Sequence, residues 1–429
     1  MQLFGTSGIR GVVDKNLVQL ALRVGLAVGN VYSNVVVGGD TRTSSDAVKH
    51  ALISGLLVAG TKSCDVGVVP TPTLAFAARE FDAGAMVTAS HNPPQYNGIK
   101  LLNPDGSAFD SNQRHQIEEA ILSDSFSVAP WDEIGSSRIR NGVIEEHIEY
   151  ILPDFPPQLK LKVVVDCGCG AASMVTPYLL RKLGCEVTAL NCYPGGFFPR
   201  DIEPTESNLG DLIKATRELG ADLGIAHDGD GDRMMAVDDR GRFIPGDKLL
   251  VLFAREVEAK EVVTTIDASM IIDEMGFSVT RTPVGDIHVS EELKKGGGFG
   301  GEPSGSWVFP RSSLCPDGIY AAAQIVAIAS RHRLSRLVDD IPHYPILRGS
   351  IAGEGLAISQ LERHLMAMEP KSVSNIDGIK LEFEDGWLLI RASGTEPKIR
   401  VTAEAKSEAR VHQLYDSGIR AIKECIGIV

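Results

Sequence analysis

The sequence predicts an α/β protein made of three related mixed α/β units followed by a C-terminal α+β unit. Three observations support this prediction. The chain has 429 residues, which is more than one hydrophobic core holds, so typical domain sizes divide it into several parts. One β-α-β pattern occurs three times along the chain, and the residues after about position 375 follow a different pattern.

The repeated pattern is an apolar strand, a helix, a glycine and a second strand. It covers 35–37, 45–59 and 64–69, then 162–168, 173–183 and 185–190, and in shorter form 262–267, a helix to about 275 and 277–280. An apolar strand followed by a helix that a glycine ends is typical of a crossover connection. We therefore expect three sheets that are mostly parallel.

The C-terminal pattern alternates polar and apolar residues. Residues 381–390 predict a hairpin that turns at Asp385-Gly386, residues 398–404 predict a third strand, and a helix is expected over 407–423. These features indicate a small antiparallel sheet that is covered on one side. With candidate linkers at 153–157, 255–261 and 366–375, the predicted domains are 1–150, 151–253, 254–366 and 367–429.

Composition limits the classes of ligand and the compartment. The formal net charge of −14 argues against nucleic-acid or anionic-membrane partners, so an anionic ligand has to be held by a few placed cations. The seven cysteines are odd in number and lack metal-type pairing, which favours reduced thiols. Without a signal-peptide pattern or an uncharged run of membrane-spanning length, a cytoplasmic protein is expected.

The stretch from Thr88 to Lys100 follows an apolar strand and contains Ser90, His91 and two adjacent prolines. The prolines fix the backbone and exclude a helix. A serine hydroxyl on such a stiff loop, near an imidazole and an amine, has the parts of a covalent nucleophile. An ordinary polar turn explains these residue types equally well when the stretch is considered alone.

The stretch from His227 to Arg233 places Asp228, Asp230 and Asp232 at alternate positions between glycines. Three carboxylates on a tightly curved loop can bind one hard divalent cation through oxygen. An EF-hand is excluded because its sixth and twelfth positions would be Arg233 and Asp239. A solvated acidic turn without a cation would leave like charges close together.

Three further loops suit a phosphorylated sugar. Gly301–Gly305 carries Glu302 and Ser304, an acceptor and a hydroxyl that fit sugar hydroxyl groups. Between Arg391 and Arg400, hydroxyl groups and cations surround a glycine and form a candidate phosphate cradle, with Ser393, Gly394 and Thr395 at its centre. The loop 5–11 contains a single cation, Arg10. Each loop alone is also compatible with a surface turn.

Together these loops resemble the α-D-phosphohexomutase family. The matching stretches are 88–93 with 98–100, 228–233, 301–305 and 391–397, in the family's order across nearly the whole chain, with 5–11 as an additional match. The resemblance implies four domains around a central cleft. The form of the sugar loop and the short chain are most similar to the archaeal-type phosphoglucosamine mutases, although Ser306 stands where bacterial members often carry histidine.

The resemblance also implies the reaction. Ser90 would carry a phosphoryl group that moves between the 6- and 1-positions of a glucosamine phosphate by way of a hexose 1,6-bisphosphate. One Mg²⁺ per chain would be held by Ser90, Asp228, Asp230 and Asp232. Proton transfer would fall to His91, Lys100 or Arg10. The substrate contacts it implies are Glu302, Ser304, Arg233, Gly285, Asp286, Arg391, Ser393, Gly394, Thr395 and Arg400.

Several alternatives remain open. Phosphomannomutase or phosphoglucomutase activity fits the same family, and the enzyme is expected to be a monomer or a homodimer. A serine hydrolase would need a Gly-x-Ser-x-Gly turn, which Ser90 lacks. A non-catalytic Ca²⁺-binding protein would explain only the acidic loop.

Overall fold

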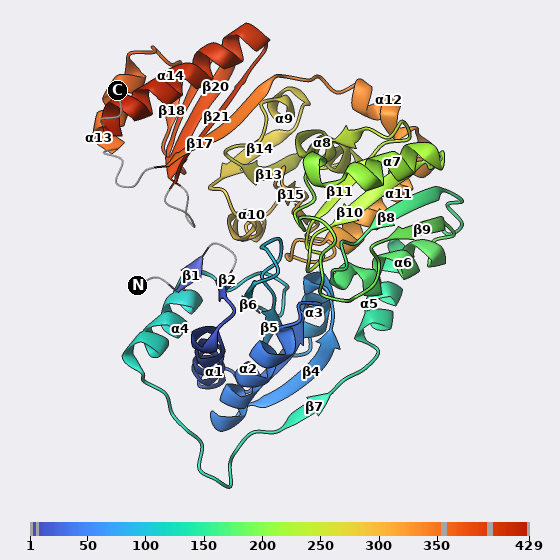
Figure 1. Ribbon diagram of the computed structural model, residues 1–429, viewed down its shortest axis with the longest axis vertical. Helices are drawn as coiled ribbons and strands as arrows, with labels where there is room; N and C mark the ends of the chain where they lie inside the picture. Colours follow the sequence, from blue (N-terminus) through green and yellow to red (C-terminus); the bar gives the residue numbers. More distant parts are fainter. Residues whose placement is uncertain (1–2, 6–7, 353–357, 393–397, 427–429) are drawn as a thin grey trace.

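The computed structural model describes residues 3–5, 8–352, 358–392 and 398–426. It contains four β-sheets, and each is formed by strands that follow one another in the sequence (Figure 1). We refer to each sheet with its helices as the first, second, third and fourth unit. The predicted α/β architecture with a C-terminal antiparallel sheet is therefore confirmed, while the domain boundaries given above remain a prediction.

The first unit holds a seven-stranded sheet in the order β1-β2-β6-β5-β3-β4-β7. Its strands are β1 (Phe4–Gly5), β2 (Gly8–Val12), β3 (Asn34–Gly39), β4 (Lys62–Val68), β5 (Ala83–Val87), β6 (Tyr96–Leu102) and β7 (Ser137–Ile139). Its helices are α1 (Lys15–Gly29), α2 (Ser45–Val58), α3 (Thr71–Ala78), α4 (Ser111–Ser123) and α5 (Val143–Ile151). The strand β3 is apolar and wholly buried apart from its first residue, because helices cover the sheet.

The second unit has the strand order β12-β11-β10-β8-β9 and the third has β14-β13-β15-β16. The second contains β8 (Lys162–Asp166), β9 (Glu186–Leu190), β10 (Leu223–His227), β11 (Met234–Val237), β12 (Phe243–Ile244), α6 (Thr176–Lys182) and α7 (Gly210–Glu218). The third contains β13 (Glu261–Thr265), β14 (Ser278–Thr282), β15 (Phe299–Gly301), β16 (Trp307–Val308), α8 (Gly246–Glu256), α9 (Ile271–Glu274), α10 (Asp286–Leu293), α11 (Gly318–Arg331) and α12 (Leu334–Asp339). One hydrophobic core runs through both units.

The fourth unit is an antiparallel sheet in the order β17-β21-β20-β19-β18. Its elements are β17 (Ile346–Ala352), β18 (Ser372–Ser374), β19 (Ile379–Phe383), β20 (Gly386–Ala392), β21 (Lys398–Ala405), α13 (Ile358–Met366) and α14 (Glu408–Ile426). Both helices lie on one face of the sheet (Figure 1), so the predicted hairpin, third strand and covering helix are confirmed. Among the helices in the described ranges, none combines the length and apolar character needed to cross a lipid bilayer.

The expectation of mostly parallel sheets is confirmed for the third sheet, where two of the three strand pairings are parallel. It is wrong for the first and second sheets, where only half of the pairings are parallel. In the first, β5 pairs with β3 in parallel but with β6 antiparallel. The loops with Ser90, with the aspartates and with Glu302 are the hairpins that connect β5 to β6, β10 to β11 and β15 to β16. The fourth loop connects β20 to β21 in the same way. The three loops of the first three units are thus equivalent hairpins, while residues 393–397 of the fourth loop lie outside the described residues.

The fourth unit contacts the third through buried polar groups and a small apolar cluster. The Glu404 carboxylate is 1% exposed and accepts hydrogen bonds from the Ser269 hydroxyl, the Met270 backbone amide and the Trp387 indole. Lys380 is 2% exposed and donates to the Ile266 carbonyl at 3.0 Å. Because a buried charge without partners is costly, these contacts fix how the two units meet.

We expect Glu404→Ala to lower the free energy of unfolding by about 2 kcal/mol, because three buried donors lose their acceptor. Urea denaturation followed by tryptophan fluorescence measures the change, since Trp387 is one of those donors. Glu384→Ala, in the turn after β19, is the control, because the Glu384 side chain is exposed. Equal loss of stability in both variants would contradict this role for Glu404.

Candidate active site

A cleft of about 870 Å³ lies between the four units. The predicted residues that line it are Arg10, Ser90, His91, Asp232, Arg233, Gly285, Asp286, Glu302, Ser304, Arg391 and Arg400. Lys100, Asp228 and Asp230 are buried beside it. Ser393, Gly394 and Thr395 lie outside the described residues. Side chains separated by up to several hundred positions in the sequence are therefore brought together.

The Ser90 backbone has an unusual conformation. Its φ is +49°, in the left-handed region that non-glycine residues rarely adopt. The Ser90 amide donates to the Thr88 hydroxyl at 2.8 Å. The Ser90 hydroxyl donates to Asp228 Oδ2 at 2.6 Å and lies 3.3 Å from His91 Nδ1. The candidate nucleophile of the first unit therefore contacts the acidic loop of the second unit directly.

Arg42, which the sequence analysis did not identify, supports the loop that carries Ser90. Its guanidinium donates to the carbonyl oxygens of Ser90 (2.8 Å), Asn92 (2.7 Å), Pro93 (2.7 Å) and Tyr96 (2.9 Å). The remaining donor, Nε, lies 3.1 Å from Asp40 Oδ2. All five donors of the guanidinium are thus used within the fold. The sequence signal was Asp40-Thr41-Arg42 directly after the buried strand β3.

The three aspartates fit a divalent cation. Asp228, Asp230 and Asp232 each offer an oxygen, and these oxygens lie within 4.8 Å of one another. Asp230 Oδ1 and Asp232 Oδ1 are buried without a hydrogen-bond partner. Buried carboxylate oxygens with no donor are costly, and a hard cation would satisfy them. The residues present therefore match the chemistry of a Mg²⁺ site.

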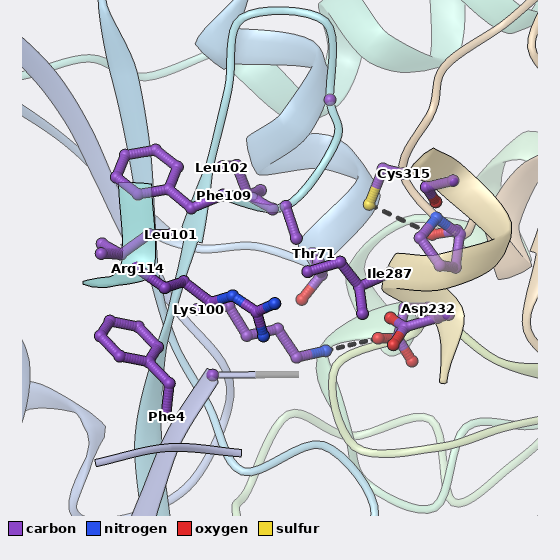
Figure 2. A pocket seen from close by; sticks show the side chains of 16 residues that line it. Phe4, Thr71, Lys100, Leu101, Leu102, Phe109, Arg114, Asp232, Ile287 and Cys315 are labelled. Carbon is purple, nitrogen blue, oxygen red and sulfur yellow. Dashed lines mark hydrogen bonds and ion pairs between the residues drawn. The ribbon is translucent and has the colours of Figure 1, made fainter. Parts of the chain in front are cut away.

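Lys100 neutralises part of this acidic charge. Its ammonium lies 2.8 Å from Asp230 Oδ2 and also contacts Asp232 (Figure 2). Burial and the neighbouring carboxylates of Asp232 and Asp230 raise the pKa of Asp228. Burial also acts to raise the pKa of Asp230, but the charge of Lys100 outweighs it and holds that pKa below its usual range. One lysine leaves the triad with excess negative charge.

Thr71, at the start of α3, is a second residue that the sequence analysis missed. Its hydroxyl donates to Asp230 Oδ2 at 2.5 Å, and its backbone amide donates to the Asp230 carbonyl at 2.8 Å. Together with Lys100 and Asp232 it lines a small cavity of about 30 Å³ (Figure 2). Two side chains of the first unit, Thr71 and Lys100, thus orient Asp230 and Asp232 through hydrogen bonds.

Glu302 is the carboxylate of the loop 301–305, and its pKa is raised. It is 7% exposed, accepts from the Gly285 amide at 2.8 Å and lies 3.4 Å from the Ser304 hydroxyl. Burial and the nearby charge of Asp286 raise the pKa of Glu302 to about 7, against the opposing effect of Arg233. Gly285 has φ +137°, a conformation that favours glycine and that presents its amide to Glu302.

Arginines and carboxylates both line the rest of the cleft, and two of the arginines are held by acidic partners. Arg233 Nη1 lies 2.8 Å from Glu203, and Arg391 Nη1 lies 3.2 Å from Asp377. The charge of Arg233, followed by burial, lowers the pKa of His91, which is therefore neutral. Glu203 and Asp377 were also missed by sequence reasoning. Arg400 lies opposite Arg391 in the sheet.

Arg10 Nη1 donates to Asn92 Oδ1 at 2.8 Å, so a cation also reaches the loop that carries Ser90. The site therefore joins a hydroxyl in contact with a carboxylate, a metal-competent acidic triad and several guanidinium groups. Fixed positive charge around a hydroxyl suits the stabilisation of a transferring phosphoryl group.

Comparison with known proteins agrees with this geometry. Four sequence families described as phosphoglucomutase/phosphomannomutase match the chain: alpha/beta/alpha domain I at residues 1–128, domain II at 145–241, domain III at 245–344 and the C-terminal domain at 354–419.

Similar whole chains carry related names. A protein of Methanocella arvoryzae named "Probable phosphoglucosamine mutase" is 49% identical over 99% of both chains, and one of Pyrococcus horikoshii with the same name is 43% identical over 99% of this chain and 98% of its own. The crystal structure of a phosphoglucomutase/phosphomannomutase family protein from Burkholderia thailandensis superposes with a TM-score of 0.88 at 30% identity, covering 99% of this chain and 98% of that one. The chain therefore belongs to the phosphoglucomutase/phosphomannomutase family, within the α-D-phosphohexomutases.

Proposed function

We propose that this enzyme interconverts glucosamine 6-phosphate and glucosamine 1-phosphate through a phosphoserine at Ser90. The contact of the Ser90 hydroxyl with Asp228 at 2.6 Å, inside a cleft lined by guanidinium groups, is the observation that carries the proposal. The names of relatives that are 42–49% identical support the choice of sugar.

In the proposed forward direction, the O1 hydroxyl of glucosamine 6-phosphate attacks the phosphoryl group on Ser90. A P–O bond forms to O1, the bond to Ser90 Oγ breaks, and the proton of O1 is transferred so that Ser90 ends as a neutral hydroxyl. The bisphosphorylated sugar then turns, and Ser90 Oγ attacks the phosphoryl group on O6. The bond between phosphorus and O6 breaks, and the proton of the Ser90 hydroxyl is passed to O6. Glucosamine 1-phosphate leaves, and the phosphoserine is restored.

His91 is the candidate among our three whose ring nitrogen lies next to the serine oxygen, at 3.3 Å. A neutral imidazole can accept a proton, which Arg10 and the ammonium of Lys100 cannot. Lys100 and Arg10 instead contribute positive charge. We therefore assign proton transfer at Ser90 to His91.

The acidic triad is proposed to hold one Mg²⁺ together with an oxygen on Ser90. Such an ion, when bound, offsets negative charge on the transferring phosphoryl group. The chain's own part is to aim Asp228, Asp230 and Asp232 at one point, and Thr71 and Lys100 support the ionised form of Asp230 through hydrogen bonds to its carboxylate.

Substrate contacts are proposed at the other two hairpins. Arg391 and Arg400, with Ser393, Gly394 and Thr395, would bind the phosphate that is not being transferred. Glu302 and Ser304 would accept sugar hydroxyl groups, with Gly285 and Asp286 beside them and Arg233 facing the reacting phosphate. Because the two phosphates exchange places, both contacts have to accept either orientation of the sugar.

The first prediction concerns substrate and nucleophile. Wild-type enzyme assayed with glucosamine, glucose and mannose 6-phosphates in parallel is expected to give the highest kcat/KM for glucosamine. Ser90→Ala is expected to lose both turnover and incorporation of labelled phosphate from glucose 1,6-bisphosphate, because no oxygen remains to accept the phosphoryl group.

Ser54→Ala is the control, because the Ser54 hydroxyl only donates to the His50 carbonyl within α2. Preference for glucose or mannose phosphate would reassign the enzyme to phosphoglucomutase or phosphomannomutase activity. Normal turnover by Ser90→Ala would overturn the phosphoserine mechanism itself.

The second prediction concerns the metal. Asp230→Asn should lower kcat about 100-fold and weaken Mg²⁺ binding at least about tenfold, because one anionic ligand is lost. Excess Mg²⁺ should restore the activity only in part. Isothermal titration calorimetry with Mg²⁺ measures binding apart from turnover. The exposed Asp211→Asn on α7 is the control, and unchanged Mg²⁺ affinity in Asp230→Asn would refute the site.

The third prediction concerns pH. Below about pH 7 Glu302 is protonated, and above it the carboxylate can accept from sugar hydroxyls. We therefore expect KM to fall as the pH rises through about 7. Glu302→Gln should raise KM about tenfold and remove this pH dependence of KM. Glu206 is an exposed carboxylate at the same cleft, and the control variant Glu206→Gln should retain the pH dependence of KM. Steady-state kinetics at several pH values measure KM for each variant. An unchanged dependence of KM on pH in Glu302→Gln would exclude Glu302 as the group responsible for it.

A further inference from the structure

We propose that Arg42 is a positioning residue that sets the conformation of Ser90, so that its loss impairs phosphoryl transfer rather than substrate binding. This inference rests on the proposed role of Ser90 as nucleophile. Arg42 does not line the cleft, and its side chain is fully buried. Its effect on the reaction therefore has to pass through the residues that it contacts.

The loop between β5 and β6 depends on Arg42 for much of its hydrogen bonding, although the Asn92 amide donates to the Ala89 carbonyl and the Tyr96 amide to the Pro93 carbonyl. Pro93 and Pro94 lack backbone donors, so the loop has more carbonyl oxygens than amides available to satisfy them. Four of these carbonyls accept from the single guanidinium of Arg42, at 2.7 to 2.9 Å. The guanidinium therefore adds four hydrogen bonds to a segment with few backbone donors, one of them to the Pro93 carbonyl that also accepts from the Tyr96 amide.

The backbone amide and the backbone carbonyl of Ser90 are each linked to the carboxylate of Asp40 through one intervening side chain. On one side, Arg42 joins the Ser90 carbonyl to Asp40 Oδ2, and on the other, Thr88 joins the Ser90 amide to the same oxygen. The strained φ of +49° at Ser90 is held between these two links. This conformation places the hydroxyl 2.6 Å from Asp228.

The second unit covers this arrangement. The Phe198 ring lies 5.1 Å from the Arg42 guanidinium, and the Thr41 hydroxyl donates to the Cys169 carbonyl at 2.9 Å. A buried guanidinium with an ion pair and an aromatic cover is held rigidly, because any movement leaves charged donors unpaired. Lysine cannot replace it, since one ammonium cannot reach four carbonyls in a plane.

The test compares Arg42→Lys with wild type in transfer of labelled phosphate from glucose 1,6-bisphosphate to Ser90 and in steady-state turnover. We expect kcat to fall about 100-fold, because a misplacement near 1 Å costs about that much, while KM changes less than about threefold. Free guanidinium ion added to Arg42→Gly should recover part of the lost transfer rate.

Amide hydrogen exchange over residues 88–97 gives a readout independent of activity. Exchange there should be faster in Arg42→Lys than in wild type. Arg23→Lys is the matched control, because Arg23 also donates to a carbonyl and a carboxylate in the first unit, those of Ile121 and Asp124. It should leave both kcat and this exchange unchanged.

Two results would overturn the role of Arg42: wild-type kcat in a folded Arg42→Lys variant, or unchanged exchange over 88–97. A wild-type enzyme that takes no phosphate on Ser90 would count against the proposed function instead. The exchange measurement still decides in that case whether Arg42 sets the conformation of the loop.

Discussion

The burial of like charges in one place is the constraint on which the rest of the structure depends. Asp228, Asp230 and Asp232 lie on a single loop of the second unit, and their positive and hydroxyl partners come from the first. Neither unit alone can satisfy these groups, because a buried carboxylate without a donor or cation is costly. The site therefore exists only where the two units meet, and the remaining oxygens still call for a cation.

The equivalent position of the hairpins in the first three units explains how their loops reach one cleft. In the first three units, the site loop leaves the carboxyl end of a strand that has a parallel partner and returns as an antiparallel neighbour. Carboxyl ends of parallel strands share one edge of a sheet, so a loop placed there faces outward at that edge. The same placement in each unit brings the hydroxyl, the carboxylates and the sugar loop to one side.

The sequence predicted the four loops because each concentrates polar residues and glycine in a short stretch, such as Asp228 to Arg233. It did not predict the antiparallel neighbours, since β15 and β16 are too short to show a period. Arg42, Thr71, Glu203 and Asp377 were missed for another reason. Their roles depend on partners between 14 and 159 positions away, which no local pattern reveals. The cradle residues 393–395 remain a prediction.

The contact between the third and fourth units also determines which way Arg391 and Arg400, the proposed phosphate contacts, point. Side chains on a strand alternate between faces, so Arg400, Thr402 and Glu404 share one face of β21, as Trp387, Leu389 and Arg391 share one face of β20. Glu404 and Trp387 are fixed against the third unit by buried hydrogen bonds and apolar contacts. A slip of one residue would turn both arginines away from the cleft and bury their neighbours instead. The register that satisfies Glu404 is therefore also the one that presents positive charge to the substrate.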